Sequence, residues 1–111
     1  MAYDTDLADR IRELLAGEPD LTEMKMFGGL AYLLAGHMAV AASGQGGILV
    51  RVDPTAAVDL TRETNARFME MRGRQLRGWL RVESGDVRTK RQLARWVALG
   101  TAHARSLPPE S

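Results

Sequence analysis

Hydrophobic side chains recur at helical spacing in the first part of the chain. Leu7, Ile11 and Leu14 are three or four positions apart, so a helix over residues 4–16 would have one apolar face. Acidic side chains stand at its start and Gly17 follows its end, as is typical of helix boundaries. The pattern therefore predicts a first helix that packs one side against a core.

Short apolar runs separated by glycine-rich turns follow this helix. The runs predict three strands, at residues 24–34, 38–42 and 48–52. The connections between them have three and five residues, whereas a parallel pair needs a crossover of about a dozen or more. The three strands are therefore expected to be antiparallel neighbours.

The next segment begins with a helix signal. Asp53 can accept hydrogen bonds from first-turn N–H groups and Pro54 suits the first helical position, so a helix is predicted to about Arg62. Residues 64–75 show no clear period. Residues 76–82 alternate between polar and apolar side chains, which predicts another strand.

A last helix is predicted from Thr89 to the Pro108-Pro109 pair, with its apolar residues on one stripe. The order of elements indicates an α+β fold in two layers. We expect an antiparallel sheet of four to five strands with the helices packed mainly on one face. A chain of this length is expected to form a single domain over residues 1–111.

Two adjacent glycines, Gly28 and Gly29, follow Phe27 inside the first predicted strand. Glycine within a strand marks a bulge, a bend, or close approach by another backbone or a ligand. No helix or cationic side chain follows the pair, so we interpret it as a bulge that bends the strand and lets the first or last helix approach. A ligand seated against the pair is the alternative.

A second glycine-rich segment contains Gly44, Gly46 and Gly47. Phosphate-binding loops place such glycines before a helix N-terminus and add a lysine and a hydroxyl group. Here the segment is followed by the apolar run at 48–52, which reads as a strand. The segment therefore predicts a hairpin turn and no nucleotide site.

Composition narrows the class of protein. Apolar residues make up 45% of the 111 residues, and cysteine is absent, which excludes disulfides and thiolate chemistry. The first residues are acidic and no apolar run approaches the roughly 20 residues of a membrane span. We therefore expect a soluble, cytoplasmic protein without a membrane partner.

Charge is unevenly distributed along the chain. Residues 1–61 hold 4 basic and 9 acidic side chains, whereas residues 62–111 hold 11 basic and 5 acidic ones. A basic half can indicate an anionic partner such as nucleic acid. The alternatives are that the two halves attract each other or simply form solvated faces.

Candidate catalytic groups are few. The chain has two histidines, His37 and His103, with no partner at metal-ligand spacing. Ser43, His37 and Asp53 can be combined as a triad on paper, but no strained strand-to-helix turn exposes the serine. The sequence therefore predicts no catalytic residue, no cofactor, no metal site and no enzymatic activity.

The strand at 76–82 carries the sharpest candidate surface. Alternation puts Arg77, Trp79 and Arg81 on one side, and Arg51 joins them from the neighbouring strand. Trp and Arg are favoured in protein interfaces, so this side can form a contact with a protein partner or a homodimer interface. The same side chains can stack bases and hold phosphates. Intramolecular cover over the tryptophan is the third interpretation.

Three stretches of this sequence resemble the TfoX N-terminal domain family, also called TfoX/Sxy. They are MKMFGGLAYLLAGHMAVAASGQGGILVRVDP at 24–54, RGWLRV at 77–82 and LARWVALGTAHARSLPP at 93–109. The resemblance implies a two-layer fold with a central antiparallel sheet. It also implies a link to regulators of bacterial competence that act in transcription and have no catalytic residues to carry over.

Full-length competence regulators of this type carry a second, C-terminal domain, whereas this sequence ends just after the last predicted helix. We therefore expect a non-enzymatic regulatory or adaptor module that acts by protein–protein contact, with an unknown partner or a second copy. Direct nucleic-acid binding through the basic C-terminal half is the alternative.

Overall fold

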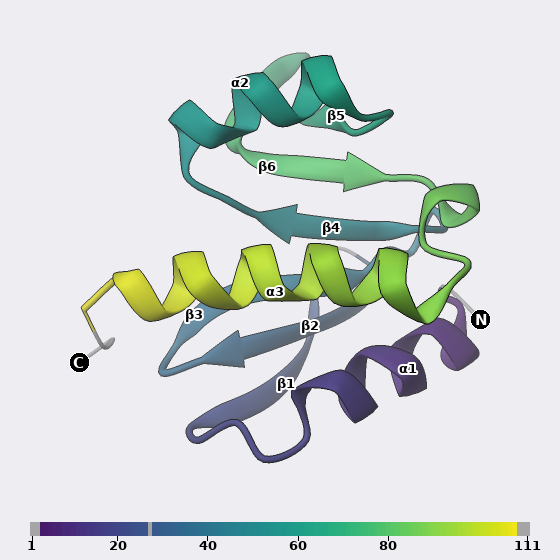
Figure 1. The fold of residues 1–111 in the computed structure, drawn as a ribbon, viewed down its shortest axis with the longest axis vertical. Coiled ribbons are helices and arrows are strands. Elements are labelled where there is room, and N and C mark those ends of the chain that lie inside the picture. The colour runs from purple at the N-terminus through teal and green to yellow at the C-terminus, as the bar shows by residue number, and fades with distance from the viewer. Residues whose placement is uncertain (1–2, 27, 109–111) are drawn as a thin grey trace.

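The computed structural model of the chain describes residues 3–26 and 28–108 (Figure 1). Within this range three α-helices and six strands follow one another, with a short 3-10 turn before the last helix. Their bounds are α1 Thr5–Leu15, β1 Leu21–Met26, β2 Gly29–Leu34, β3 His37–Ala42, β4 Ile48–Arg51, α2 Pro54–Glu63, β5 Arg67–Met71, β6 Arg74–Val82, η1 Ser84–Asp86 and α3 Lys90–Ser106.

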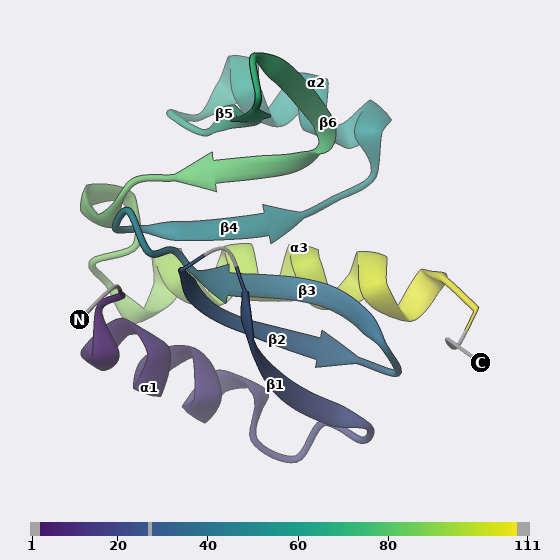
Figure 2. The same cartoon turned by 180° about the vertical axis from the view of Figure 1, so that it is seen from behind.

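The strands form one antiparallel sheet in the order β1-β2-β3-β4-β6-β5. All three helices lie on the same face of this sheet (Figures 1 and 2). Helix α3 packs across β3 and β4, α2 covers β5 and β6, and α1 lies beside α3. The predicted α+β two-layer fold is confirmed, with six strands where four to five were expected.

Two features account for the larger number of strands. The apolar run expected as one strand at 24–34 is a hairpin, in which β1 begins at Leu21 and pairs with β2 so that Met24 lies opposite Ala31. The stretch at 64–75, which has no clear period, contains β5. This strand lies at the edge of the sheet and has no fully buried residue, so it lacks the regular apolar alternation of an inner strand.

The interpretation of Gly28 and Gly29 as a bulge is wrong. Gly28 lies in the turn between β1 and β2 with φ +74°, a left-handed conformation that glycine adopts without strain. A Cβ on Gly29 would lie 2.1 Å from the carbonyl oxygen of Ala42. The close approach therefore comes from the end of β3 and not from a helix. Phe27, the third residue of this motif, lies outside the described residues.

The turn between β3 and β4 packs against the turn between β1 and β2. A Cβ on Gly44 would lie 2.5 Å from the carbonyl oxygen of Gly28, and one on Gly47 would lie 2.2 Å from that of Val82. The amide of Gly46 donates to the carbonyl of Ser43 at 3.1 Å, which closes the turn. Glycines at these positions thus let three backbone segments meet at one end of the sheet.

The main core lies between the helices and the sheet. Tyr32 of β2 is fully buried in it, and its hydroxyl donates a 2.6 Å hydrogen bond to the carbonyl oxygen of Ala8 in α1. Because burial disfavours the phenolate, the pKa of Tyr32 is raised to about 12. Among the other large, fully buried side chains are Ile11, Leu15, Leu34, Ile48, Leu80 and Leu93.

Helix α3 begins with a capping box and crosses the sheet at a glycine. The Thr89 hydroxyl accepts from the Gln92 amide while the Gln92 side chain accepts from the Thr89 amide. A Cβ on Gly100 would lie 2.3 Å from the carbonyl oxygen of Ala39, so the helix backbone touches β3 there. None of the described helices is both long and apolar enough to cross a bilayer.

Candidate interaction face

One face of the sheet is not covered by any described helix (Figure 2). Alternate side chains of a strand point to opposite faces, and those away from the helices form a second apolar cluster. We call this side the open face. Its buried members are Ala31, Met38, Ala41 and Leu49, and Met26, Leu33, Met69 and Trp79 pack around them.

The centre of the open face is shielded by its own side chains. Ala31 and Ala41 are small and nearly inaccessible because larger neighbours stand on both sides of them. Met24, opposite Ala31 on the edge strand β1, is 48% exposed and is the one exposed large apolar side chain in the described part of the chain. Methionine adapts its shape readily and is common at binding surfaces. The apolar surface that the open face offers to a partner is therefore Met24 and the partly buried side chains around the cluster.

Arg51 and Trp79 form a pair on this face. They lie directly opposite each other on β4 and β6, and the Arg51 guanidinium is 5.6 Å from the centre of the indole ring. This separation is within the range of a cation–π interaction. Trp79 is half-buried, so the pair presents both an aromatic side chain and a positive charge next to the apolar cluster.

Arg81 lies on the same face, but its guanidinium already forms contacts within the molecule. Its guanidinium donates to the Ser43 hydroxyl at 3.1 Å and to the Gly46 carbonyl at 3.0 Å, and it approaches Glu83 at 3.4 Å. Only 17% of its side chain is exposed. Arg81 therefore fastens the β3–β4 turn to β6 and has little capacity left for a partner.

Arg77 is exposed and lies at an irregularity of the sheet. Phe68 of β5 pairs with Leu80 of β6, yet the next residue, Met69, pairs with Leu76. Three residues of β6 are therefore accommodated between consecutive residues of β5, and the simple alternation expected over 76–82 is broken there. No hydrogen bond or ion pair of Arg77 occurs among the described residues.

The structure adds three arginines that the sequence analysis did not single out. Arg72 and Arg74 flank Gly73 at the turn between β5 and β6, and both are exposed. Arg67 of β5 forms a 2.6 Å ion pair with Glu83. The dense run of arginines from 67 to 77 was the available signal, but without a predicted strand these residues could not be assigned to a surface.

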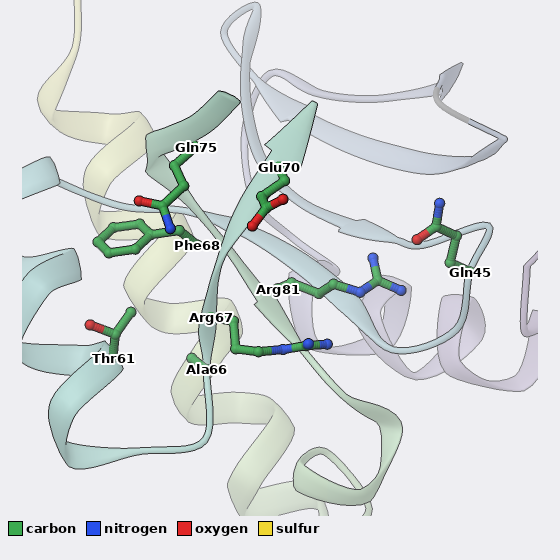
Figure 3. Close-up of a pocket in the computed structure, with 8 residues that line it drawn as sticks. All are labelled: Gln45, Thr61, Ala66, Arg67, Phe68, Glu70, Gln75 and Arg81. Atoms are coloured by element: carbon green, nitrogen blue, oxygen red, sulfur yellow. The ribbon is translucent and has the colours of Figure 1, made fainter. Parts of the chain in front are cut away.

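A shallow hollow lies between β5 and the β3–β4 turn (Figure 3). In this view the side chains of Arg67 and Arg81 extend in the same direction, toward Gln45. Both guanidinium groups contact Oε2 of Glu83, so their charge is already partly balanced. The hollow measures about 600 Å³ and is lined by Gln45, Thr61, Ala66, Arg67, Phe68, Glu70, Gln75 and Arg81.

The residues considered for catalysis do not come together. His37 begins β3 and Ser43 follows its end, so about 20 Å of strand separates them. The Ser43 hydroxyl is also occupied, because it accepts from the Gln45 amide and from Arg81. Burial, followed by the nearby Arg51 charge, lowers the pKa of His103. Within the described residues no three His, Cys, Asp or Glu side chains are grouped as metal ligands.

The comparison with protein families decides the classification. Residues 13–104 match the family model of the TfoX N-terminal domain. The chain belongs to this family. The matched part of this TfoX N-terminal domain includes the entire sheet and hence the open face. No curated protein and no solved structure matches the chain.

Proposed function

We propose that this TfoX N-terminal domain is a non-enzymatic regulatory or adaptor module that binds a protein partner through its open face. The observation that carries the proposal is the second apolar cluster, which lies on the side of the sheet opposite the described helices. Arg51 and Trp79 stand beside this cluster. Arginine and tryptophan next to a packed apolar centre are the usual composition of an interface hot spot.

Family membership supports the regulatory part of the proposal. The family resemblance links such domains to transcriptional control of competence, in the cytoplasm, where the target would be another protein of that system. The proposal contains no catalytic step, and Ser43 and His37, the pair considered for one, lie at opposite ends of β3.

A second copy of the chain is the simplest partner to test. Size-exclusion chromatography with light scattering, at low and high protein concentration, measures the mass of the wild type and of Trp79→Ala. A homodimer through the open face requires a dimeric wild type and a monomeric Trp79→Ala that melts as a folded protein. A wild type that remains a monomer at high concentration removes the homodimer.

A different protein partner is tested by affinity capture from the source organism. Trp79→Ala is expected to weaken the complex by about 30-fold or more, since truncating a hot-spot residue costs roughly 2 kcal/mol. Arg91→Ala is the matched control, because Arg91 is exposed near the start of α3, on the helix side. A partner that is lost equally with both variants, or with neither, would contradict the assignment of the open face.

A further inference from the structure

The β5–β6 hairpin concentrates positive charge at one end of the sheet. Between residues 67 and 81 it carries five arginines and a single acidic residue, Glu70. In Figure 2 the turn of this hairpin lies close to the viewer and thus curls toward the open side of the sheet. The turn, which Arg72 and Arg74 flank, therefore lies toward the open side of the sheet.

Three of these arginines form no ion pair with an acidic side chain in the described part of the chain. Arg67 and Arg81 both contact Glu83, whereas Arg72, Arg74 and Arg77 are exposed and form no ion pair or hydrogen bond among the described residues. Like charges gathered on one hairpin repel each other and are stabilised when an anion binds.

The turn also holds one arginine in an unfavourable backbone conformation. Arg72 has φ +55° and Gly73 has φ +78°, so both central residues of the two-residue turn are left-handed. Asn, Asp or Gly would occupy the first of these positions at lower cost. Arg72 thus occupies a backbone conformation that arginine disfavours, which is a reason to look for a role of its charge.

The Arg51–Trp79 pair lies two residues along β6 from Arg77. The indole is half-buried and the guanidinium lies over the ring at 5.6 Å. Indole rings and guanidinium planes are the two protein surfaces on which unpaired bases stack. At about 3.3 Å per residue, Arg74 and Trp79 lie at most about 17 Å apart, a distance that spans about five stacked nucleotides.

We infer that the hairpin binds a single strand of nucleic acid, with Arg72, Arg74 and Arg77 on its phosphates and the Arg51–Trp79 pair against its bases. The inference goes beyond the proposed function, because it adds the basic β5–β6 hairpin and a ligand of a different class; the Arg51–Trp79 pair is the element that the two surfaces share. An acidic peptide would satisfy the arginines but would leave the half-buried Arg51–Trp79 pair without a planar partner. A duplex would satisfy the arginines too, but its bases are already stacked.

Fluorescence anisotropy with labelled oligonucleotides tests the inference. The probes are single-stranded DNA and RNA of about 12 nucleotides and a duplex of the same DNA sequence. Three phosphate contacts on a single strand give a slope of about −2 in log K against log salt, so affinity falls about 100-fold between about 20 and 200 mM salt. Single strands are expected to bind more tightly than the duplex.

The charge contacts are isolated by two triple variants that remove the same number of charges. Arg72→Gln with Arg74→Gln and Arg77→Gln is expected to retain less than about a tenth of the affinity at low salt and to lose most of the salt slope. The control carries Arg88→Gln, Lys90→Gln and Arg91→Gln, which lie around the start of α3 and are all exposed. It is expected to bind like the wild type.

The stacking contact is isolated by Trp79→Ala and Trp79→Phe. Loss of one stacked base is expected to lower affinity roughly tenfold in Trp79→Ala while the salt slope stays unchanged, and Trp79→Phe recovers part of this loss. In the wild type, binding should quench the fluorescence of Trp79. The other tryptophan, Trp96, is buried in the main core and serves as an internal reference.

Four results would overturn the inference. They are the absence of binding to single strands at low salt, an equal loss in the two triple variants, duplex binding as tight as single-strand binding, and equally tight binding of polyglutamate with the same dependence on the hairpin arginines. The third result would indicate a duplex site, and the fourth a site for acidic peptides. Thermal melts of every variant verify that a loss of binding is not a loss of fold.

Discussion

Gly100 lies where α3 touches β3, and replacing it with alanine tests this contact. The added Cβ would lie 2.3 Å from the carbonyl oxygen of Ala39 and 3.3 Å from a methyl group of Val50, whereas ordinary contacts begin at 3.4 Å. The oxygen belongs to the backbone of an inner strand. The helix must therefore move away from the sheet by about 1 Å, because the strand cannot yield as a side chain would.

Two opposing effects determine how much Gly100→Ala changes the free energy of unfolding. Alanine is the better helix former and would by itself stabilise the protein by about 1 kcal/mol. Overpacking of a well-packed core costs about 1–3 kcal/mol. Because the whole helix must be displaced, we expect a cost near the upper end of this range, about 3 kcal/mol. We expect Gly100→Ala to lower the free energy of unfolding by about 2 kcal/mol, which corresponds to a fall in Tm of about 8 °C.

Urea and thermal unfolding followed by circular dichroism provide the measurement. The matched control is Ala98→Gly, because Ala98 is an exposed position of the same helix. This control is expected to lower stability by about 1 kcal/mol through helix propensity alone. If Gly100→Ala unfolds at the same or a higher temperature than the wild type, propensity wins and the close contact between α3 and β3 does not exist.

Three further predictions concern single polar groups. Tyr32→Phe removes the buried hydrogen bond to the Ala8 carbonyl and should cost about 1 kcal/mol in urea unfolding. The hydrogen bond from Arg12 lowers the pKa of Glu23, so the ionised Glu23 carboxylate stabilises the folded protein above pH 4.5 and this stabilisation is lost as the pH falls. The difference in the free energy of unfolding between wild type and Glu23→Gln should therefore shrink on acidification. Burial lowers the pKa of His103, so protonation favours the unfolded chain below pH 6.5, and His103→Gln should lose less stability than the wild type between about pH 7 and pH 5.

Helix boundaries could be predicted because their determinants are local. Asp53 accepts from the Thr55 amide at 2.7 Å and Pro54 is the first helical residue, as the sequence predicts for α2. Thr89 caps α3. A cap is formed by residues within a few positions of each other, so the sequence contains all the information that decides it.

The strands were harder to predict because glycine has more than one use. A pair of glycines inside an apolar run fits a bulge and a hairpin turn equally well from the sequence. The choice depends on Ala42 at the end of β3 and Gly44 in the turn after it, which approach Gly29 and Gly28. Such a contact joins segments that are more than a dozen residues apart, and no local pattern encodes it.

The same distinction explains which part of the interaction surface the sequence could indicate. Alternation placed Trp79 and Arg81 on one side of β6, and the register of β4 against β6 has them there, opposite Arg51 and Leu49. Alternation cannot tell whether a side chain on that side is available, since Arg81 is held by Ser43, 38 positions away in the chain. Whether a side chain is free to bind a partner depends on contacts with residues far away in the sequence. Among the arginines of the β5–β6 hairpin, Arg72, Arg74 and Arg77 form no such contact with the described residues, whereas Arg67 and Arg81 both contact Glu83.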